Sequence, residues 1–377
     1  MELFADTNTD TSQPSTIVLE RDEARAQQIE SIMEQQPPRQ SLTSHRWALI
    51  DSIRGFALAG ILLVNSVDIT EVGSRLATAG QLREPEPTRV ILDLFVQTRF
   101  VPIFAFLFGM SFRFVLDSAR RRTGSHRPWA MTLRRMLCLI LIGAALALIY
   151  PDNILFEYGI IGLVALPVIL LAPPIAVTVL GGVATIAALV FLGSGTPTLL
   201  GLILLGSGCA AFGLPRALEN GGRAIVLPFA ILLSLAVPAL LWQSTEPWDP
   251  RFTIGGAFGI IFAGLYVTGF ALLWRTRLRR PLAAVFDPLG RMALSNYVGA
   301  AAIFFLLSRL IDFPAMPSIL PVVLASLAVI AIQSTFSRLW LRTHSYGPIE
   351  WVWRAGTWWK RPGSRRQQEG TTAQPAS

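Results

Sequence analysis

The chain has 377 residues, of which 52% are hydrophobic and 15% are charged, well below the roughly 25% of charged residues in soluble domains. Apolar runs of about 20 residues recur along most of its length, which predicts a polytopic membrane protein and excludes a chain of two or three globular domains. The net charge of +8 alone would suit a nucleic-acid partner, so the position of the basic residues decides what it means.

The sequence begins with a polar segment of mixed charge, residues 1–45, that contains no apolar signal core. This composition predicts a disordered cytoplasmic tail rather than a cleaved signal peptide. We expect a polytopic transmembrane domain over residues 46–342 and an interfacial amphipathic segment, rich in Trp and Arg, over residues 343–361. Residues 362–377 again predict a disordered tail.

Within the membrane domain, apolar length and the bounding Pro, Gly and charged residues predict about ten helices and therefore an all-α bundle. The expected spans are residues 47–67, 90–116, 131–150, 154–172, 174–193, 197–214, 223–243, 254–274, 289–311 and 317–340. The two halves show no internal repeat, which weighs against an inverted-repeat transporter. In the eighth span Gly255, Gly259 and Ala263 recur at spacings of four, which predicts close packing of a neighbouring helix or, alternatively, a homodimer contact.

Basic residues gather in alternate connections between the spans. Six arginines from Arg120 to Arg135 lie in the connection between the second and third spans and at the start of the third, and four from Arg275 to Arg280 follow the eighth span. The other connections carry acidic residues and few basic ones. The positive-inside rule therefore places both termini in the cytoplasm, with the bilayer as partner. The basic excess needs no nucleic acid to explain it.

One group of polar and ionisable residues lies at the cytoplasmic ends of the spans, where such residues mark functional sites by default. Asp51 and Arg54 stand three residues apart on one face of the first span and can neutralise each other. Arg291 and, deeper in the ninth span, Asn296 lie on the same side. The group indicates either an ion pair that stabilises a helix entry or the mouth of a polar interior. Glu350 lies among several tryptophans, which favours an anchored interfacial helix.

A second group lies toward the outer side: Asn65 late in the first span, Arg99 well inside the second and Glu157 early in the fourth. A buried arginine needs a partner, and Glu157 is the nearest opposite charge by topology, with Asp93 and Asp68 as alternatives. The group indicates either a structural ion pair or a site for an anion or an acyl acceptor that opens to the exterior.

Histidine is the usual acid or base near neutral pH, but His45, His126 and His344 all lie outside the predicted spans. The sequence contains no HExxH, P-loop or GxSxG motif, which excludes the common metalloprotease, NTPase and hydrolase sites. The two cysteines lie far apart and predict neither a disulfide framework nor a metal pair. We expect no metal site and no permanently bound cofactor.

Four stretches carry a resemblance to a known family: RWALIDSIRGFALAGILLVN, RFVPIFAFLFGMSF, GRMALSNYVG and SYGPIEWVWRAGTWW. They resemble the bacterial YeiB-like family, which carries the domain of unknown function 418 and stands within a superfamily of transmembrane acyltransferases. The likeness runs from about residue 46 to residue 360. It implies about ten helices in the bacterial cytoplasmic membrane, which take an acyl group from cytoplasmic acyl-coenzyme A and pass it to a glycan, lipid or small-molecule acceptor at the outer side.

The resemblance also implies roles for the two groups of residues. Coenzyme A would be bound by the cytoplasmic group, namely Asp51, Arg54, Arg291 and Asn296. Catalysis and acceptor binding would fall to the outer group, namely Glu157, Arg99 and Asn65. A guanidinium suits the phosphates of coenzyme A because its planar fork of N–H donors matches phosphate oxygens.

The sequence departs from the superfamily at the proton-transfer group. Superfamily enzymes use a histidine close to the outer face, and the connection after the first span contains none. Leu146 stands where many relatives have a second histidine, so Glu157 or Asp68 would have to substitute. Two other functions stay open: a transporter or export protein for an anionic or hydrophobic compound, with Arg99 as counter-ion, and a non-catalytic membrane subunit that binds partners through its basic tails.

Overall fold

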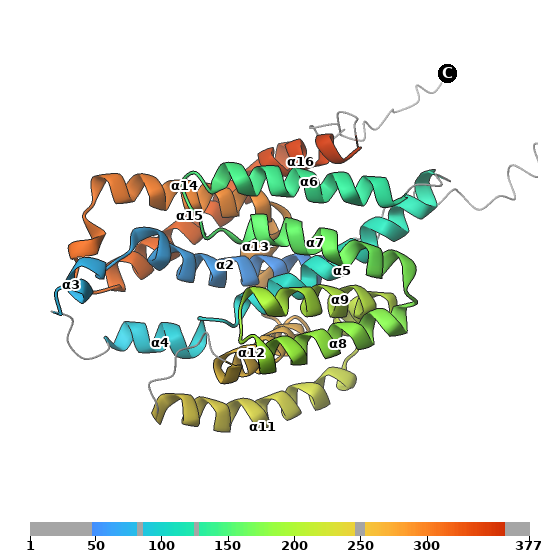
Figure 1. The fold of residues 1–377 in the computed structure, drawn as a ribbon, viewed down its shortest axis with the longest axis horizontal. Helices are drawn as coiled ribbons and strands as arrows, with labels where there is room; N and C mark the ends of the chain where they lie inside the picture. Colours follow the sequence, from blue (N-terminus) through green and yellow to red (C-terminus); the bar gives the residue numbers. More distant parts are fainter. Residues whose placement is uncertain (1–46, 81–85, 124–127, 246–252, 359–377) are drawn as a thin grey trace, which may run out of the picture. The chain divides into compact units, whose positions relative to one another are not determined.

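The computed structural model describes residues 47–80, 86–123, 128–245 and 253–358. These residues form helices, with no β-strand among them, joined by short connections (Figure 1). In chain order the helices are α2 (Ala48–Thr70), α3 (Ser74–Thr78), α4 (Pro87–Phe95), α5 (Phe100–Thr123), α6 (Pro128–Leu146), α7 (Ile154–Leu171), α8 (Pro174–Phe191), α9 (Thr196–Ala211), α10 (Leu214–Asn220), α11 (Arg223–Thr245), α12 (Thr253–Leu273), α13 (Arg279–Arg291), α14 (Ala293–Leu310), the 3₁₀ turn η1 (Phe313–Ala315), α15 (Leu320–Thr343) and α16 (Pro348–Trp358). The predicted tails, residues 1–45 and 362–377, lie outside the described residues.

The predicted fold class, an all-α bundle of about ten transmembrane helices, is confirmed. In the described part of the chain nine helices are long and apolar enough to cross a membrane, and α9 with α10, bent by 71° at their junction, make a tenth if the pair is one span. Large apolar side chains on α8 and α11 remain exposed, as expected where the surrounding solvent is lipid. The protein is therefore a multi-pass integral membrane protein.

Local sequence signals explain where several helices begin and end. The side chain of Asn153 accepts a hydrogen bond from the backbone N–H of Phe156 at 3.3 Å and so caps α7. Pro174 opens α8, where its missing N–H costs nothing. Gly213, with a φ of 82°, separates α9 from α10 in a left-handed conformation that glycine adopts at little cost.

Two predicted spans are broken, contrary to the expectation of continuous helices. The second span stops at the end of α4 and resumes at α5, with a turn between them in which Thr98 has a φ of 63°. Arg99 lies in this turn and not inside a helix. The ninth span is interrupted at Met292, between α13 and α14. A β-branched residue at positive φ is strained, so the break at Thr98 is held by the surrounding packing.

Helix α2 packs against α5, α12, α13, α14 and α15, and Figure 1 shows it in the middle of the bundle. Its closest neighbour is α13. A Cβ atom at Gly55 would lie 2.0 Å from the backbone oxygen of Phe286, and one at Gly290 would lie 1.8 Å from that of Asp51. Only glycine permits this approach, and it brings the first turns of α2 beside the end of α13, where Arg291 lies.

Candidate functional site

A cavity of about 300 Å³ lies among helices α2, α5, α6, α7, α13, α14 and α16. We name it the cationic cavity because three arginines line it, each from a different helix: Arg54, Arg135 and Arg291. The rest of its lining is largely apolar or aromatic and includes Leu58, Ile61, Phe104, Phe108, Leu139, Tyr158, Tyr297 and Trp353. The predicted proximity of Arg54 to Arg291 is thus present in the structure.

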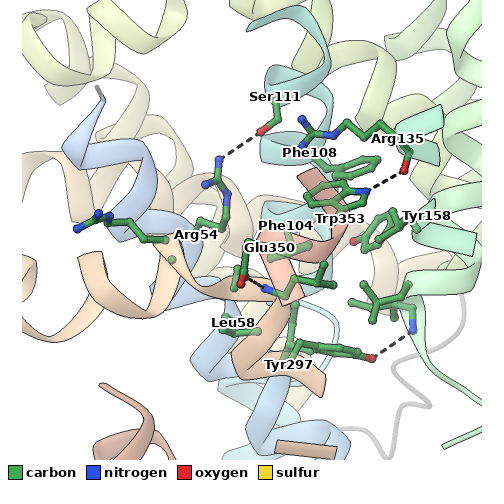
Figure 2. Close-up of a pocket in the computed structure, with 18 of the residues that line it drawn as sticks. Arg54, Leu58, Phe104, Phe108, Ser111, Arg135, Tyr158, Tyr297, Glu350 and Trp353 are labelled. Atoms are coloured by element: carbon green, nitrogen blue, oxygen red, sulfur yellow. Dashed lines mark hydrogen bonds between the residues drawn. The ribbon is translucent and has the colours of Figure 1, made fainter. Parts of the chain in front are cut away.

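Arg54 is held in place but remains at the cavity wall. Its Nη1 donates to Asp51 Oδ1 at 2.9 Å, which forms the ion pair expected from their spacing, and its Nη2 donates to Ser111 Oγ at 3.2 Å. Both side chains of the pair are about one-fifth exposed, at 23% and 19%. Figure 2 shows Arg54, Ser111 and Arg135 gathered at one end of the cavity, with Tyr297 and Leu58 toward the other.

The sequence analysis used Arg135 only to predict the membrane topology, but this arginine lines the cationic cavity. Its guanidinium lies 4.1 Å from the centre of the Trp353 ring, and its backbone oxygen accepts a hydrogen bond from Trp353 Nε1 at 2.9 Å. The Arg54 guanidinium lies at the same end of the cavity (Figure 2). Two guanidinium groups at one end of a cavity suit an anionic group, because each can donate charge-assisted hydrogen bonds to it.

Helix α16 contributes a carboxylate to the same cavity. Glu350 Oε1 accepts hydrogen bonds from the backbone N–H groups of Leu294 at 2.7 Å and Ser295 at 3.0 Å, and its Oε2 accepts from the Ser295 hydroxyl. Glu350 therefore caps the first turn of α14, whose own flanking residue provides no side-chain cap. Burial raises the pKa of Glu350, and the hydrogen bonds from Ser295 and Leu294 offset only part of that rise.

The segment 343–361, predicted to be an interfacial amphipathic segment, contacts the helix bundle through its described part. Helix α16 packs against α6 and α14, and Glu350 and Trp353 form part of the cavity wall. The glutamate among the tryptophans was the sequence signal for this contact, because a carboxylate that is removed from water needs hydrogen-bond donors.

Two tyrosines close the apolar end of the cationic cavity. The Tyr297 hydroxyl accepts hydrogen bonds from the backbone N–H of Ile154 and from Asn65 Nδ2, both at 3.2 Å. The Tyr158 hydroxyl donates to the backbone oxygen of Val101 at 3.2 Å. Figure 2 shows the Tyr297 ring crossing this end of the cavity, with its hydroxyl directed at α7.

A second cavity, of about 400 Å³, lies directly beyond these tyrosines. We name it the neutral cavity because the polar side chains that line it, among the residues that the structure describes, are not ionisable: Asn65, Gln97, Thr98, Ser194, Thr196 and Thr198. Ile61 lines both cavities. Asn65 and Val101, which line the neutral cavity, are hydrogen-bonded to Tyr297 and Tyr158, which line the cationic one. One layer of side chains therefore separates the two cavities.

Arg99 does not form the ion pair that the sequence suggested. Its side chain is fully buried and lines neither cavity. Its guanidinium donates to the backbone oxygen of Gln97 and to Gln243 Oε1, and lies 5.1 Å from the Phe262 ring centre. No acidic side chain of the described residues lies within ion-pair distance of it. The prediction failed because the break between α4 and α5 turns Arg99 toward α11 and α12.

The proposed partners of Arg99 have other neighbours. Glu157, at the start of α7, is partly exposed, and its Oε2 accepts from the Thr196 hydroxyl at 3.0 Å. Asp93 pairs with Arg89 at 3.6 Å and interacts with Arg99 only at longer range. Asp68 is exposed at the end of α2. Because Thr196 lines the neutral cavity, Glu157 remains adjacent to that cavity.

Asn296, the remaining residue predicted to bind coenzyme A, lies outside the lining of both cavities. Its side-chain amide donates to the backbone oxygen of Leu289 at 3.3 Å and to Ser337 Oγ at 3.0 Å. These bonds join α14 to α13 and α15. Its cofactor-binding role stays a prediction.

Comparisons with known proteins test the family resemblance. Residues 216–360 match the family model described as a protein of unknown function, DUF418. The chain is 26% identical over 385 residues to protein YeiB of Escherichia coli K12, and the alignment covers 81% of this chain and 94% of the relative. The predicted resemblance to the YeiB-like family with the domain of unknown function 418 is confirmed by these matches. The chain is also 25% identical over 390 residues to YxaH of Bacillus subtilis strain 168, across 84% of this chain and 96% of that protein.

A further relative of this protein is a 39.9 kDa protein encoded in the 3′ region of an amylase gene of Bacillus acidopullulyticus. The two are 29% identical over 340 residues, covering 83% of this chain and 94% of the relative. All three relatives are named as uncharacterised. The family match contains Arg291, Tyr297 and Glu350, whereas Arg54 and Arg135 lie before it. The cationic cavity is thus built from both parts of the chain.

Proposed function

We propose that this protein transfers an acyl group from acyl-coenzyme A, bound in the cationic cavity, to a hydroxyl-rich acceptor in the neutral cavity. The observation that carries the proposal is the single layer of side chains between the two cavities, with Ile61 exposed to both. A donor and an acceptor that enter from different sides could meet only at such a partition. In this proposal the donor side faces the cytoplasm, which the arginine-rich connections favour by the positive-inside rule.

The composition of the cationic cavity supports an acyl-coenzyme A donor. Arg54, Arg135 and Arg291 supply guanidinium groups for phosphates. Toward the tyrosines the lining becomes aromatic and aliphatic, with Phe104 and Phe108 facing the same space, which suits a thioester and its acyl chain. A ligand with an anionic part and an apolar end matches both halves of the cavity.

The composition of the neutral cavity supports an acceptor such as a glycan. Its hydroxyl and amide side chains can donate and accept hydrogen bonds without selecting a charge. The counter-ion role that a transporter would require of Arg99 gains no support, because Arg99 lines neither cavity.

In the proposed reaction the acceptor oxygen forms a bond to the acyl carbon and loses its proton, while the carbon–sulfur bond breaks and the departing thiolate takes up a proton. Glu157 is the general base that removes the acceptor's proton, either directly or through the Thr196 hydroxyl, which donates a hydrogen bond to it. Tyr297 accepts two hydrogen bonds, so its own hydroxyl hydrogen remains to donate to the carbonyl oxygen as negative charge develops there. Asn65 orients that hydroxyl.

Binding of acetyl-coenzyme A to the purified protein in detergent tests the donor half of the proposal. We expect saturable binding that weakens about tenfold or more in Arg54→Ala and in Arg291→Ala, because each removes a charge-assisted hydrogen bond of about 1.5–3 kcal/mol. Arg309→Ala, which removes an exposed arginine at the far end of α14, is the matched control and should bind as the wild type does. Absence of binding in the wild type would overturn the acyl-coenzyme A mechanism.

Release of free coenzyme A thiol tests the catalytic half. With a panel of oligosaccharide acceptors, we expect turnover to fall in Glu157→Gln and Tyr297→Phe while acetyl-coenzyme A binding is retained. Normal turnover in Glu157→Gln would remove that residue as the base. Binding without turnover for every acceptor would favour a non-catalytic subunit.

A further inference from the structure

A third cavity, separate from the two above, is an apolar groove of about 500 Å³ formed by α11, α12 and α13 with one side chain of α2. We name it the α11–α13 groove. Its walls are almost entirely hydrocarbon and consist of Phe56, Phe229, Leu233, Leu265, Tyr266, Gly269, Phe270, Leu272, Leu273, Thr276, Leu282 and Phe286. Its size falls within the usual range for small-molecule sites.

Among the described residues two polar side chains line the groove, and the protein itself satisfies the hydrogen bonds of both. The Tyr266 hydroxyl donates to the backbone oxygen of Phe95 at 2.8 Å. The Thr276 hydroxyl donates to the backbone oxygen of Leu273 at 2.7 Å and accepts from the N–H of Leu278 at 3.1 Å. No donor or acceptor is left to recognise a polar ligand, so the part of an occupant that lies in the groove is hydrocarbon.

Aromatic rings give the groove a defined shape. Phe56, Phe270 and Phe286 contact one another with ring centres 5.4–5.9 Å apart, and such contacts hold each ring in a preferred orientation. On the opposite wall Phe229 faces Gly269, where an added Cβ would lie 3.2 Å from the ring. The groove is therefore a feature of packed helices and not a gap between mobile side chains.

One end of the groove lies at a cluster of arginines. Thr276, which lines the groove, stands between Arg275 and Arg277, and Arg279 and Arg280 begin α13. All four arginines are exposed, and residues 274–286 contain no acidic side chain. None of the four forms an ion pair with another residue that the structure describes. The Arg279 guanidinium lies 5.4 Å from the Trp274 ring centre, within the range of a cation–π contact.

We infer that the α11–α13 groove binds one anionic phospholipid, with an acyl chain between α11 and α13 and the phosphate on the arginines that join α12 to α13. Charge complementarity selects an anionic headgroup, since arginines near the bilayer surface attract anionic lipids. The hydrocarbon walls select the chain. This site does not depend on the proposed acyl transfer, because the two cavities of that site use other helix faces.

Native mass spectrometry of the full chain in detergent, titrated with dioleoyl phosphatidylglycerol, tests the chain-binding half. Leu233→Trp fills the groove, and Leu235→Trp is its matched control, because Leu235 is an equally exposed leucine on α11 that does not line the groove. We expect one tightly retained lipid in the wild type and in Leu235→Trp, and at least tenfold weaker retention in Leu233→Trp. Equal retention in both variants would overturn the site and leave only non-specific annular lipid.

The headgroup half is tested with Arg277→Gln and the control Arg342→Gln, which removes an exposed arginine at the end of α15. We expect Arg277→Gln to weaken phosphatidylglycerol binding about fivefold and to leave phosphatidylcholine binding unchanged, with no effect of Arg342→Gln. Equal loss for both lipids would overturn the anionic selection. Thermal unfolding of each variant with and without lipid checks folding. A lipid-free dimer covering the groove would overturn the proposal.

Discussion

Arg54 and Arg99 are both arginines that the sequence places inside predicted spans, but their surroundings differ. Arg54 lines the cationic cavity and has an acidic partner, Asp51, at 2.9 Å. Arg99 is fully buried, lines neither cavity and is held by the oxygens of Gln97 and Gln243 and by the Phe262 ring. The first guanidinium is neutralised and accessible, whereas the second is surrounded by neutral groups and inaccessible.

This difference separates a ligand-binding residue from a structural one. A residue that binds an anion must keep part of its surface at a cavity, and a local carboxylate allows it to remain charged when the cavity is empty. A residue that holds a break between two helices needs donors directed at fixed oxygens. Arg99 donates to α11 and to the turn between α4 and α5, so we expect its loss to affect folding and the loss of Arg54 to affect binding.

The largest effect is expected for Arg99→Ala. The substitution leaves the oxygens of Gln243 and Gln97 without their donor and removes the contact with Phe262, so the free energy of unfolding should fall by about 3 kcal/mol. Thermal unfolding in detergent measures this change, and the folded fraction should bind acetyl-coenzyme A as the wild type does. Lost binding with unchanged stability would make Arg99 a ligand-binding residue and reverse the comparison.

The next effect is expected for Leu58→Trp, in the apolar half of the cationic cavity. The larger side chain removes volume near Tyr297 without touching the arginines, so affinity should fall about tenfold for a long-chain acyl-coenzyme A and little for acetyl-coenzyme A. Competition binding with donors of increasing chain length measures the selectivity. Equal losses for all chain lengths would mean that the acyl group does not reach this end.

The smallest effect is expected for Glu350→Gln and concerns pH. Because burial raises the pKa of Glu350 in the folded protein above the ordinary value of 4.5, the folded state holds this proton more tightly than the unfolded chain does. The stability that this adds is complete below pH 4.5 and is lost as the pH rises through the raised pKa. The free energy of unfolding measured across this window should fall as the pH rises, and Glu350→Gln should remove that fall.

The exposed Glu71→Gln is the control for that experiment and should keep the wild-type pH dependence. An unchanged pH dependence in Glu350→Gln would show that the Glu350 carboxylate is not buried against α14 in the folded protein.

The fold was predictable from the sequence because apolar length and bounding charges report directly on membrane spans. The breaks at Thr98 and Met292 were not predictable, because each lies beside a close contact between segments that the sequence does not pair. An added Cβ at Gly259 would lie 2.6 Å from the backbone oxygen of Thr98, and one at Gly290 would lie 1.8 Å from that of Asp51. Gly259 of α12 therefore packs against Thr98 of the same chain. This contact supports close packing within the chain, the first of the two alternatives predicted for the small residues of the eighth span.

The candidate site was predictable in part. The spacing of Asp51 and Arg54 predicted their pairing, and topology placed Arg291 on the same side. Topology could not show that Arg135 turns toward Trp353, nor that Glu350 reaches the first turn of α14, because both depend on the docking of a helix that follows the last span. Asn65 was selected because it is a polar residue late in a predicted span, and the structure adds its partner Tyr297.

The most direct measurement of the central claim uses an acyl-coenzyme A analogue with a photoreactive group at the end of its acyl chain. Irradiation of the purified protein followed by peptide mapping should place the label on Phe104, Phe108 or Leu139, which line the apolar part of the cationic cavity, and excess acetyl-coenzyme A should prevent it. Labelling confined to lipid-facing residues such as Leu235, or unaffected by the competitor, would contradict acyl-coenzyme A binding in this cavity.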